Sequence, residues 1–168
     1  MAYEFVPQFT RMLTNLSAIL DKTQAFADQK KFSVGNLLVT RLAPDQFDFT
    51  RQIQITCDTA KFFAAKLTGK EAPKHEDKET TLPELQARIQ STILFLNTIK
   101  PEDFKGWESR KTTNPRREGK YLPGNEFAMQ QAIPNFFFHM TTAYSILRNA
   151  GMDIGKKDFL GTLNYRDL

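Results

Sequence analysis

Asn135 and His139 stand within the apolar stretch Ile133–Tyr144, and their side chains are types that can bind a ligand or move a proton. They are spaced i, i+4, so a helix would place them on one face. The three consecutive phenylalanines between them would point about 100° apart, which predicts a helix that is apolar nearly all round and mostly buried. A buried polar pair needs a protein partner, a water or a ligand.

Gln54 and Asp58 form a second i, i+4 pair on another predicted helix. If the two helices face each other, these two residues would form one polar cluster with Asn135 and His139. Asp58 would then orient His139 by accepting a ring N–H. The cluster is either an acid–base pair, a remnant metal site or a hydrogen-bonded core histidine. The catalytic residues are unknown. We expect no metal cofactor, because a weakly held divalent metal would have only His139, Asp58 and Asn135 as donors.

Few other residues could carry chemistry. We expect His75 to be solvated in a polar loop and Cys57 to be a small buried filler, because a reactive thiol needs a nearby cation or helix N-terminus. The segment from Lys105 to Lys120 holds six basic and two acidic residues. It could bind phosphate or an acidic ligand, but a solvated loop is the simpler interpretation. The sequence lacks the familiar phosphate-binding, serine-nucleophile and zinc motifs.

Four amphipathic segments of about 20 residues would position these side chains. The first runs from Tyr3 to Lys30. The second runs from Gln46, after Asp45 as N-cap, to about Leu67, with Gly69 closing it. The third opens with the capping box Thr81–Glu84 and ends near Ile99. The fourth runs from Asn125 to Ala150, with Pro134 interrupting it and Gly151 following it.

This pattern predicts an all-α four-helix bundle, formed by residues 1–168 as one domain. Between the third and fourth helices, Ser109–Thr113 and Gly119–Leu122 could pair as a short hairpin. The tail after Met152 should be irregular. The fourth helix is apolar on more sides than one bundle can bury, which favours a homodimer.

Composition narrows the possible partners. The net charge is +4 at a pI of about 9.2, and it arises from the Lys105–Lys120 segment, so we expect no nucleic-acid partner. No apolar run approaches the roughly 20 residues of a membrane span, and the first thirty residues lack a signal-peptide core, so we expect no membrane partner. Cys57 is the single cysteine, which favours a cytoplasmic location.

Several segments together resemble a known family. They are Arg41–Asp45, Gln52–Lys61, Glu79–Thr81, Pro134–Phe136 with His139, Thr142–Arg148 and Gly155–Gly161. The chain is similar over nearly its whole length to an uncharacterised family of the DinB/YfiT-like superfamily. The resemblance implies an up-down-down-up four-helix bundle that is often dimeric.

Many members of that superfamily resemble metal-dependent enzymes, including thiol transferases, with one histidine on the second helix and a His-x-x-x-His pair on a later helix. In this chain Asn135 takes the place of the first histidine of the pair and His139 retains the second. The second helix offers Gln54 or Asp58 and no histidine. The resemblance therefore favours a degenerate metal site in a bundle that binds a small molecule or dimerises. The alternative is a divergent metal-dependent transferase or hydrolase.

Overall fold

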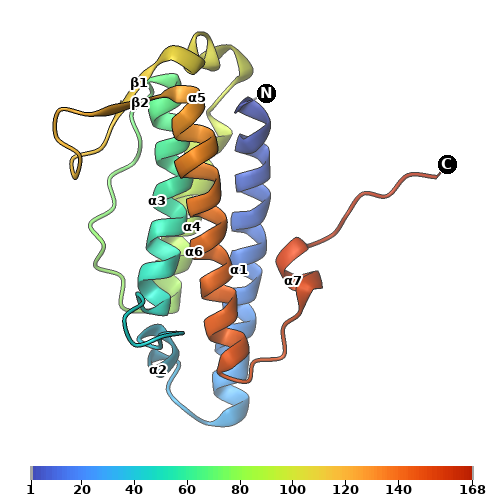
Figure 1. Ribbon diagram of the computed structural model, residues 1–168. Coiled ribbons are helices and arrows are strands. Elements are labelled where there is room, and N and C mark those ends of the chain that lie inside the picture. Colours follow the sequence, from blue (N-terminus) through green and yellow to red (C-terminus); the bar gives the residue numbers. More distant parts are fainter. Residues whose placement is uncertain (1, 168) are drawn as a thin grey trace.

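The computed structural model describes residues 2–167, and four long helices dominate it (Figure 1). They are α1 (Phe5–Lys30), α3 (Phe49–Thr68), α4 (Leu82–Asn97) and α6 (Ile133–Asn149). α1 and α6 run in one direction, and α3 and α4 run in the other (Figure 1). This is the four-helix bundle that the sequence predicted, with the up-down-down-up order that the family resemblance implied. The parallel pair α3 and α4 requires a long return connection, and the segment from 69 to 81 provides it along the outside of the bundle.

The first helix forms because its apolar residues recur every three or four positions, as predicted. A short 3₁₀ turn, η1 (Ala2–Glu4), leads into α1. The buried face of α1 includes Phe9, Leu13, Leu16 and Leu20, none of them more than 1% exposed. Lys31 ends the helix in a left-handed conformation, and its N–H bonds the Ala27 carbonyl. A short helix, α2 (Gly35–Leu38), then leads the chain toward α3.

The N-cap of α3 differs from the prediction. Asp48, not Asp45, accepts a hydrogen bond from the Arg51 N–H and opens the helix. Both aspartates precede an apolar periodic run, but the backbone turns at Ala43–Gln46 before it becomes helical. The predicted end is confirmed: Gly69 has φ of +81° and closes α3. The predicted capping box of α4 is also confirmed, with Thr81 and Glu84 satisfying each other's backbone N–H groups.

Short elements cover one end of the bundle between α4 and α6. Two 3₁₀ turns, η2 (Pro101–Phe104) and η3 (Trp107–Ser109), precede an antiparallel hairpin of β1 (Lys111–Thr113) and β2 (Tyr121–Pro123). The hairpin confirms the predicted pairing, with Thr112 opposite Leu122. Its loop projects to one side of the bundle (Figure 1). Gly124 is required after β2, because a Cβ there would lie 1.9 Å from the Trp107 carbonyl oxygen.

The predicted interruption of the last long helix takes the form of a π-helical turn. α5 (Gly124–Glu126) and the π-helical η4 (Phe127–Ala132) lead directly into α6, where Pro134 occupies the first turn. Because the helix continues through η4 into α6, Pro134 lies inside it and cannot donate a backbone hydrogen bond to the preceding turn. The π-helical turn directly before Pro134 accommodates this interruption. α6 ends at Asn149, and Gly151 follows with φ of +87°.

The three phenylalanines of α6 have three different environments. Phe136 is fully buried, and its ring centroid lies 4.3 Å from that of Phe9 on α1. Phe137 is half-buried against Phe136, and Phe138 is 55% exposed. Only one of the three therefore belongs fully to the core.

The tail is more ordered than the sequence predicted. It contains α7 (Lys156–Leu160), which packs against α1. Asn15 Nδ2 donates to the Phe159 carbonyl at 3.0 Å, and Lys22 pairs with Asp158 at 2.5 Å. The prediction of an irregular tail was wrong for residues 156–160, because these anchors come from polar residues on α1, which are distant in sequence. None of the described helices is long and apolar enough to cross a membrane.

Candidate functional site

A cavity of about 610 Å³ lies between α3, α6 and the hairpin. We call it the α3–α6 cavity. Its lining includes Asp58, Asn135 and His139, three of the four residues singled out from the sequence. Aromatic side chains form part of its walls: Phe47, Phe62 and Phe127. Cavities of this size accommodate small organic molecules.

His139 faces this cavity as a neutral imidazole. Gln52 Nε2 donates to the Phe47 carbonyl at 3.0 Å, so the Gln52 Oε1 atom is turned toward His139. His139 Nδ1 lies 2.7 Å from that oxygen and must donate to it. Burial, and then the positive charge of Arg51, lower the pKa of His139 to about 4. Nε2 is therefore an unprotonated acceptor at neutral pH, and it bonds nothing within residues 2–167.

Asp58 does not orient His139, and that prediction was wrong. The Asp58 carboxylate binds Arg88 at 2.6 Å and Lys61 at 2.9 Å. The physical reason is charge: a carboxylate with two buried cations in reach gains more from them than from a neutral imidazole. Asp58 still lines the α3–α6 cavity, but its charge is already compensated.

Asn135 lies opposite α3, as predicted, but its partner there is Thr59. Asn135 Nδ2 donates to Thr59 Oγ1 at 2.8 Å. Gln54, in contrast, is not part of the cavity lining. Its side chain bonds Glu79 and Arg51 at 2.9 Å each, on the side of α3 that faces the 69–81 connection. The predicted cluster of four thus divides into two groups, Asn135 with His139 and Gln54 with Asp58.

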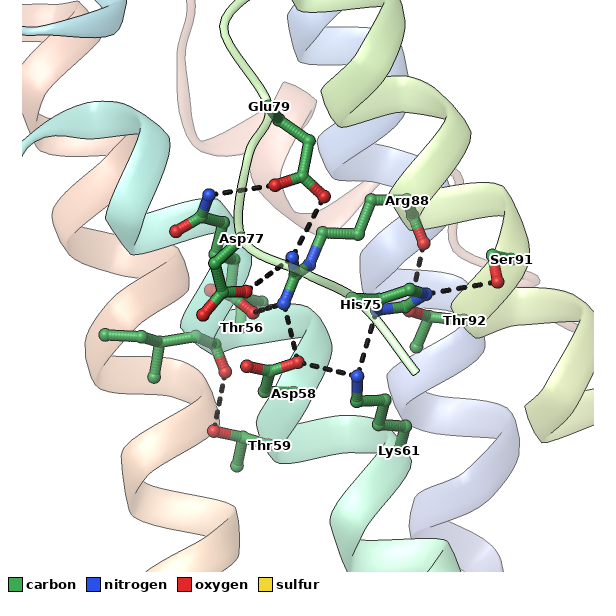
Figure 2. Close-up of polar contacts among 12 residues, drawn as sticks. Thr56, Asp58, Thr59, Lys61, His75, Asp77, Glu79, Arg88, Ser91 and Thr92 are labelled. Carbon is green, nitrogen blue, oxygen red and sulfur yellow. Dashed lines mark hydrogen bonds and ion pairs between the residues drawn. The ribbon is translucent and has the colours of Figure 1, made fainter. Parts of the chain in front are cut away.

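The second group is a buried ionic network around Arg88 of α4 (Figure 2). The Arg88 side chain is 1% exposed and reaches Asp58 on α3 and Asp77 and Glu79 in the connection, at 2.6, 2.7 and 2.9 Å. Burial opposes ionisation of both carboxylates in the connection. Hydrogen bonds outweigh it, from Arg51 and then Arg88 at Asp77 and chiefly from Arg88 at Glu79, and they hold the pKa of each carboxylate below its usual value. We call this set the Arg88 network.

His75 belongs to the same region, and the expectation that it would be merely solvated was wrong. Its Nδ1 lies 3.0 Å from the buried Lys61 ammonium, and its Nε2 lies 3.1 Å from Ser91 Oγ (Figure 2). Nδ1 must accept from Lys61, because an ammonium only donates. Burial, then Lys61 and Arg88, lower the pKa of His75. The 69–81 connection is therefore fastened to α3 and α4 and is not a free surface loop.

Sequence reasoning missed Arg88, although a signal was present. Arg88 falls within the buried stripe of α4 that also contains Leu85, Ile89 and Thr92. A charged side chain in such a stripe requires a partner. Cys57, by contrast, is the buried filler that the sequence predicted, and burial raises its pKa to about 12.

The donors in the cavity do not fit a tightly bound metal. Within residues 2–167, no three or more His, Cys, Asp or Glu side chains are grouped to hold an ion. The cavity offers one imidazole, from His139, and the Asp58 carboxylate is occupied by two cations. The Asn135 amide points its NH₂ group at Thr59. Zinc and similar metals prefer several imidazole or thiolate donors.

Comparisons with known proteins agree with this architecture. A crystal structure described as a DinB family member protein from Shewanella denitrificans has 52% sequence identity and a TM-score of 0.93, covering 97% of this chain and 93% of that chain. The fold is thus that of a DinB-like four-helix bundle. A family model described as a domain of unknown function, DUF1993, matches residues 2–160, and the chain belongs to that family. None of the curated proteins matches the chain.

Proposed function

We propose that this protein binds a small organic molecule in the α3–α6 cavity without a metal ion. The observation that carries the proposal is the neutral imidazole of His139, which presents an unused acceptor at a 610 Å³ cavity with aromatic walls. Small-molecule sites typically combine an apolar lining with a few fixed polar groups. Gln52 and Thr59 fix His139 and Asn135 in place, so the polar groups are held before a ligand arrives.

Binding is better supported than catalysis. A general base works best with a pKa near the operating pH, and the His139 pKa of about 4 makes it a poor base at neutral pH. Its partner is the Gln52 amide, which carries no charge to stabilise an imidazolium. The alternative, a divergent metal-dependent transferase or hydrolase, would need donors that the cavity does not offer.

The test is binding of N-phenyl-1-naphthylamine, an uncharged aromatic fluorophore that brightens in apolar surroundings. We expect saturable binding to one site per chain. Ile55 lines the cavity, so Ile55→Trp should fill it and abolish binding. The control is Leu94→Trp on α4, where the side chain is 67% exposed. Absence of saturable binding, or equal binding by Ile55→Trp, would refute the proposal.

We also propose a homodimer, supported by Phe138. Its ring is 55% exposed on α6, and α6 contributes other residues to the core. An exposed aromatic on a central helix is typical of an interface between copies. Light scattering at micromolar concentration tests it: a mass near 19.3 kDa would reject the dimer.

The single buried Cys57 supports the proposed cytoplasmic location.

A further inference from the structure

The charges around the α3–α6 cavity are unequal. Three cationic side chains line it, Arg51, Lys66 and Arg116, against one carboxylate, Asp58. Asp58 is already bound by Arg88 and Lys61, and Arg51 is paired with Asp77 at 2.5 Å. The charges that remain uncompensated at the cavity are therefore positive.

Of these cations, Lys66 gives the strongest indication of a bound anion. It is half-buried on α3, and burial lowers its pKa. Within residues 2–167 no carboxylate lies within ion-pair distance of its ammonium group. The ammonium donates to the Thr113 carbonyl at 2.6 Å and lies 5.3 Å from the centre of the Phe127 ring. A half-buried cation held by neutral groups is stabilised by an anion placed beside it.

Arg116 lies on the same side of the cavity. It belongs to the hairpin loop, and its backbone N–H bonds the Asn114 side chain at 2.9 Å. Asn114, Pro115 and Arg116 all line the cavity, so the loop brings a second cation to the region of Lys66. Arg116 is exposed and forms no ion pair within the part of the chain that the structure describes.

The cavity is long and has different chemistry at its two ends. The α3 residues that line it are spread along most of the helix: Arg51, Ile55, Asp58, Thr59, Phe62 and Lys66. At about 1.5 Å of rise per residue, this stripe spans about 22 Å. His139 bonds Gln52 at one end, and Phe127 contacts Lys66 at the other. Ile55 and Phe62 provide apolar surface between them.

We propose that the ligand is an amphipathic organic anion, whose acidic group lies between Lys66 and Arg116 and whose apolar body lies along Ile55 and Phe62. A hydrogen-bond donor on the body would meet His139 Nε2. This inference rests on the proposed function, because it specifies the ligand class of the same cavity.

The experiment compares two probes that share one fluorophore. 8-Anilinonaphthalene-1-sulfonate is the sulfonated form of N-phenyl-1-naphthylamine, so their difference reports the acidic group alone. We expect the sulfonate to bind at least about tenfold more tightly, and Lys66→Gln and Arg116→Gln each to remove much of that difference. Both variants should weaken the sulfonate much more than the uncharged probe. Lys30→Gln, at an exposed position at the end of α1, is the control and should change neither affinity.

Competition distinguishes an amphipathic anion from a simple anion site. Decanoate should displace the bound sulfonate probe, and inorganic sulfate at the same concentration should not. Displacement by sulfate, or equal affinity for both probes with no effect of Lys66→Gln, would overturn the anion assignment while leaving the cavity as a binding site. Failure of both probes to bind would instead remove the proposed function itself.

Discussion

The side-chain carbonyl of Gln52 accepts the Nδ1 proton of His139 at 2.7 Å, and this contact decides what His139 can do. The Gln52 NH₂ group is committed to the Phe47 carbonyl, so the amide cannot turn over and donate to the ring. A neutral partner leaves the imidazole neutral, whereas the carboxylate expected from the sequence would have favoured the imidazolium. The site is therefore suited to accepting a hydrogen bond at Nε2.

Replacing Gln52 by Glu should test this relationship directly. A carboxylate at 2.7 Å would stabilise the imidazolium and raise the pKa of His139 from about 4 by more than about one pH unit. The measurement is an NMR titration of the histidine ring. Gln52→Leu is the control, because it removes the hydrogen bond without adding charge and should leave the pKa low. An unchanged pKa in Gln52→Glu would contradict the assigned contact.

The depressed pKa of His139 predicts a pH dependence of stability. The pKa is about 4 in the folded protein and 6.5 in the absence of its surroundings, so folding favours the neutral ring. Its contribution is fully present above about pH 6.5 and is lost as the pH falls toward 4. Between pH 7 and pH 5 the free energy of unfolding should fall by about 1–2 kcal/mol from this residue.

Urea unfolding at the two pH values measures that loss. His139→Gln should remove this contribution, and the pH dependence should become correspondingly shallower. His75 also has a lowered pKa and contributes with the same sign, so His75→Gln should flatten the remaining slope. A wild-type protein more stable at pH 5 than at pH 7 would show that the signs are wrong.

Asp58 should matter to stability through Arg88 and Lys61, not through His139. Asp58→Ala removes one anion from two buried cations and should lower the free energy of unfolding by about 1–3 kcal/mol. The NMR signals of His139 should keep the Nδ1-protonated pattern in this variant. Lys78→Ala, which breaks an exposed pair with Glu76, is the control and should cost under about 1 kcal/mol. A changed tautomer at His139 would revive the predicted Asp58–His139 pair.

Much of the fold could be predicted because its signals are local. Helix periodicity, the Thr81–Glu84 capping box and the glycines at 69 and 151 each act within a few residues, and all were identified. Asp48 was missed in favour of Asp45 because both are good caps, and the choice depends on where the preceding turn ends. α7 was missed because its anchors lie on α1, more than 130 residues away in sequence.

The site was harder to predict, because contacts between helices depend on how each helix is rotated about its axis. Gln52 and Thr59 are spaced i, i+7 and face His139 and Asn135, whereas Asp58 points about 100° away from Thr59. The sequence placed the two α6 residues on one face but could not fix that rotation. It also could not show that the 69–81 connection folds back to supply Asp77 and Glu79.

Neighbouring phenylalanines of α6 offer a matched test of the core. Phe136→Ala should lower the free energy of unfolding by about 3–5 kcal/mol, because the ring is fully buried against Phe9. Leu16→Ala, at 1% exposure, should cost about 2–5 kcal/mol. Phe138→Ala, at 55% exposure, should cost under about 0.5 kcal/mol when it is measured at a protein concentration where light scattering shows a monomer. Denaturant titration gives all three values, and equal costs for Phe136 and Phe138 would contradict the assigned orientation of α6.

Another prediction concerns metal. One imidazole, a carboxylate held by two cations and an amide that donates to Thr59 should bind transition metals only weakly. Protein purified without a metal-affinity tag should therefore contain well under one equivalent of any transition metal, and a chelator should leave the melting temperature unchanged. Stoichiometric metal by elemental analysis, lost in His139→Ala, would reject this interpretation and favour the enzyme alternative.

The same geometry predicts how a metal site could be restored. The Thr59 Oγ1 atom on α3 and the Asn135 Nδ2 atom on α6 lie 2.8 Å apart, and residue 135 is one helical turn from His139. Thr59→His combined with Asn135→His would bring three imidazoles to this part of the cavity, which is a donor set that zinc prefers. We expect the double variant to take up about one equivalent of zinc and to gain thermal stability from it. Zinc should leave the melting temperature of the wild-type protein unchanged, and failure of the folded double variant to bind zinc would show that these positions do not converge.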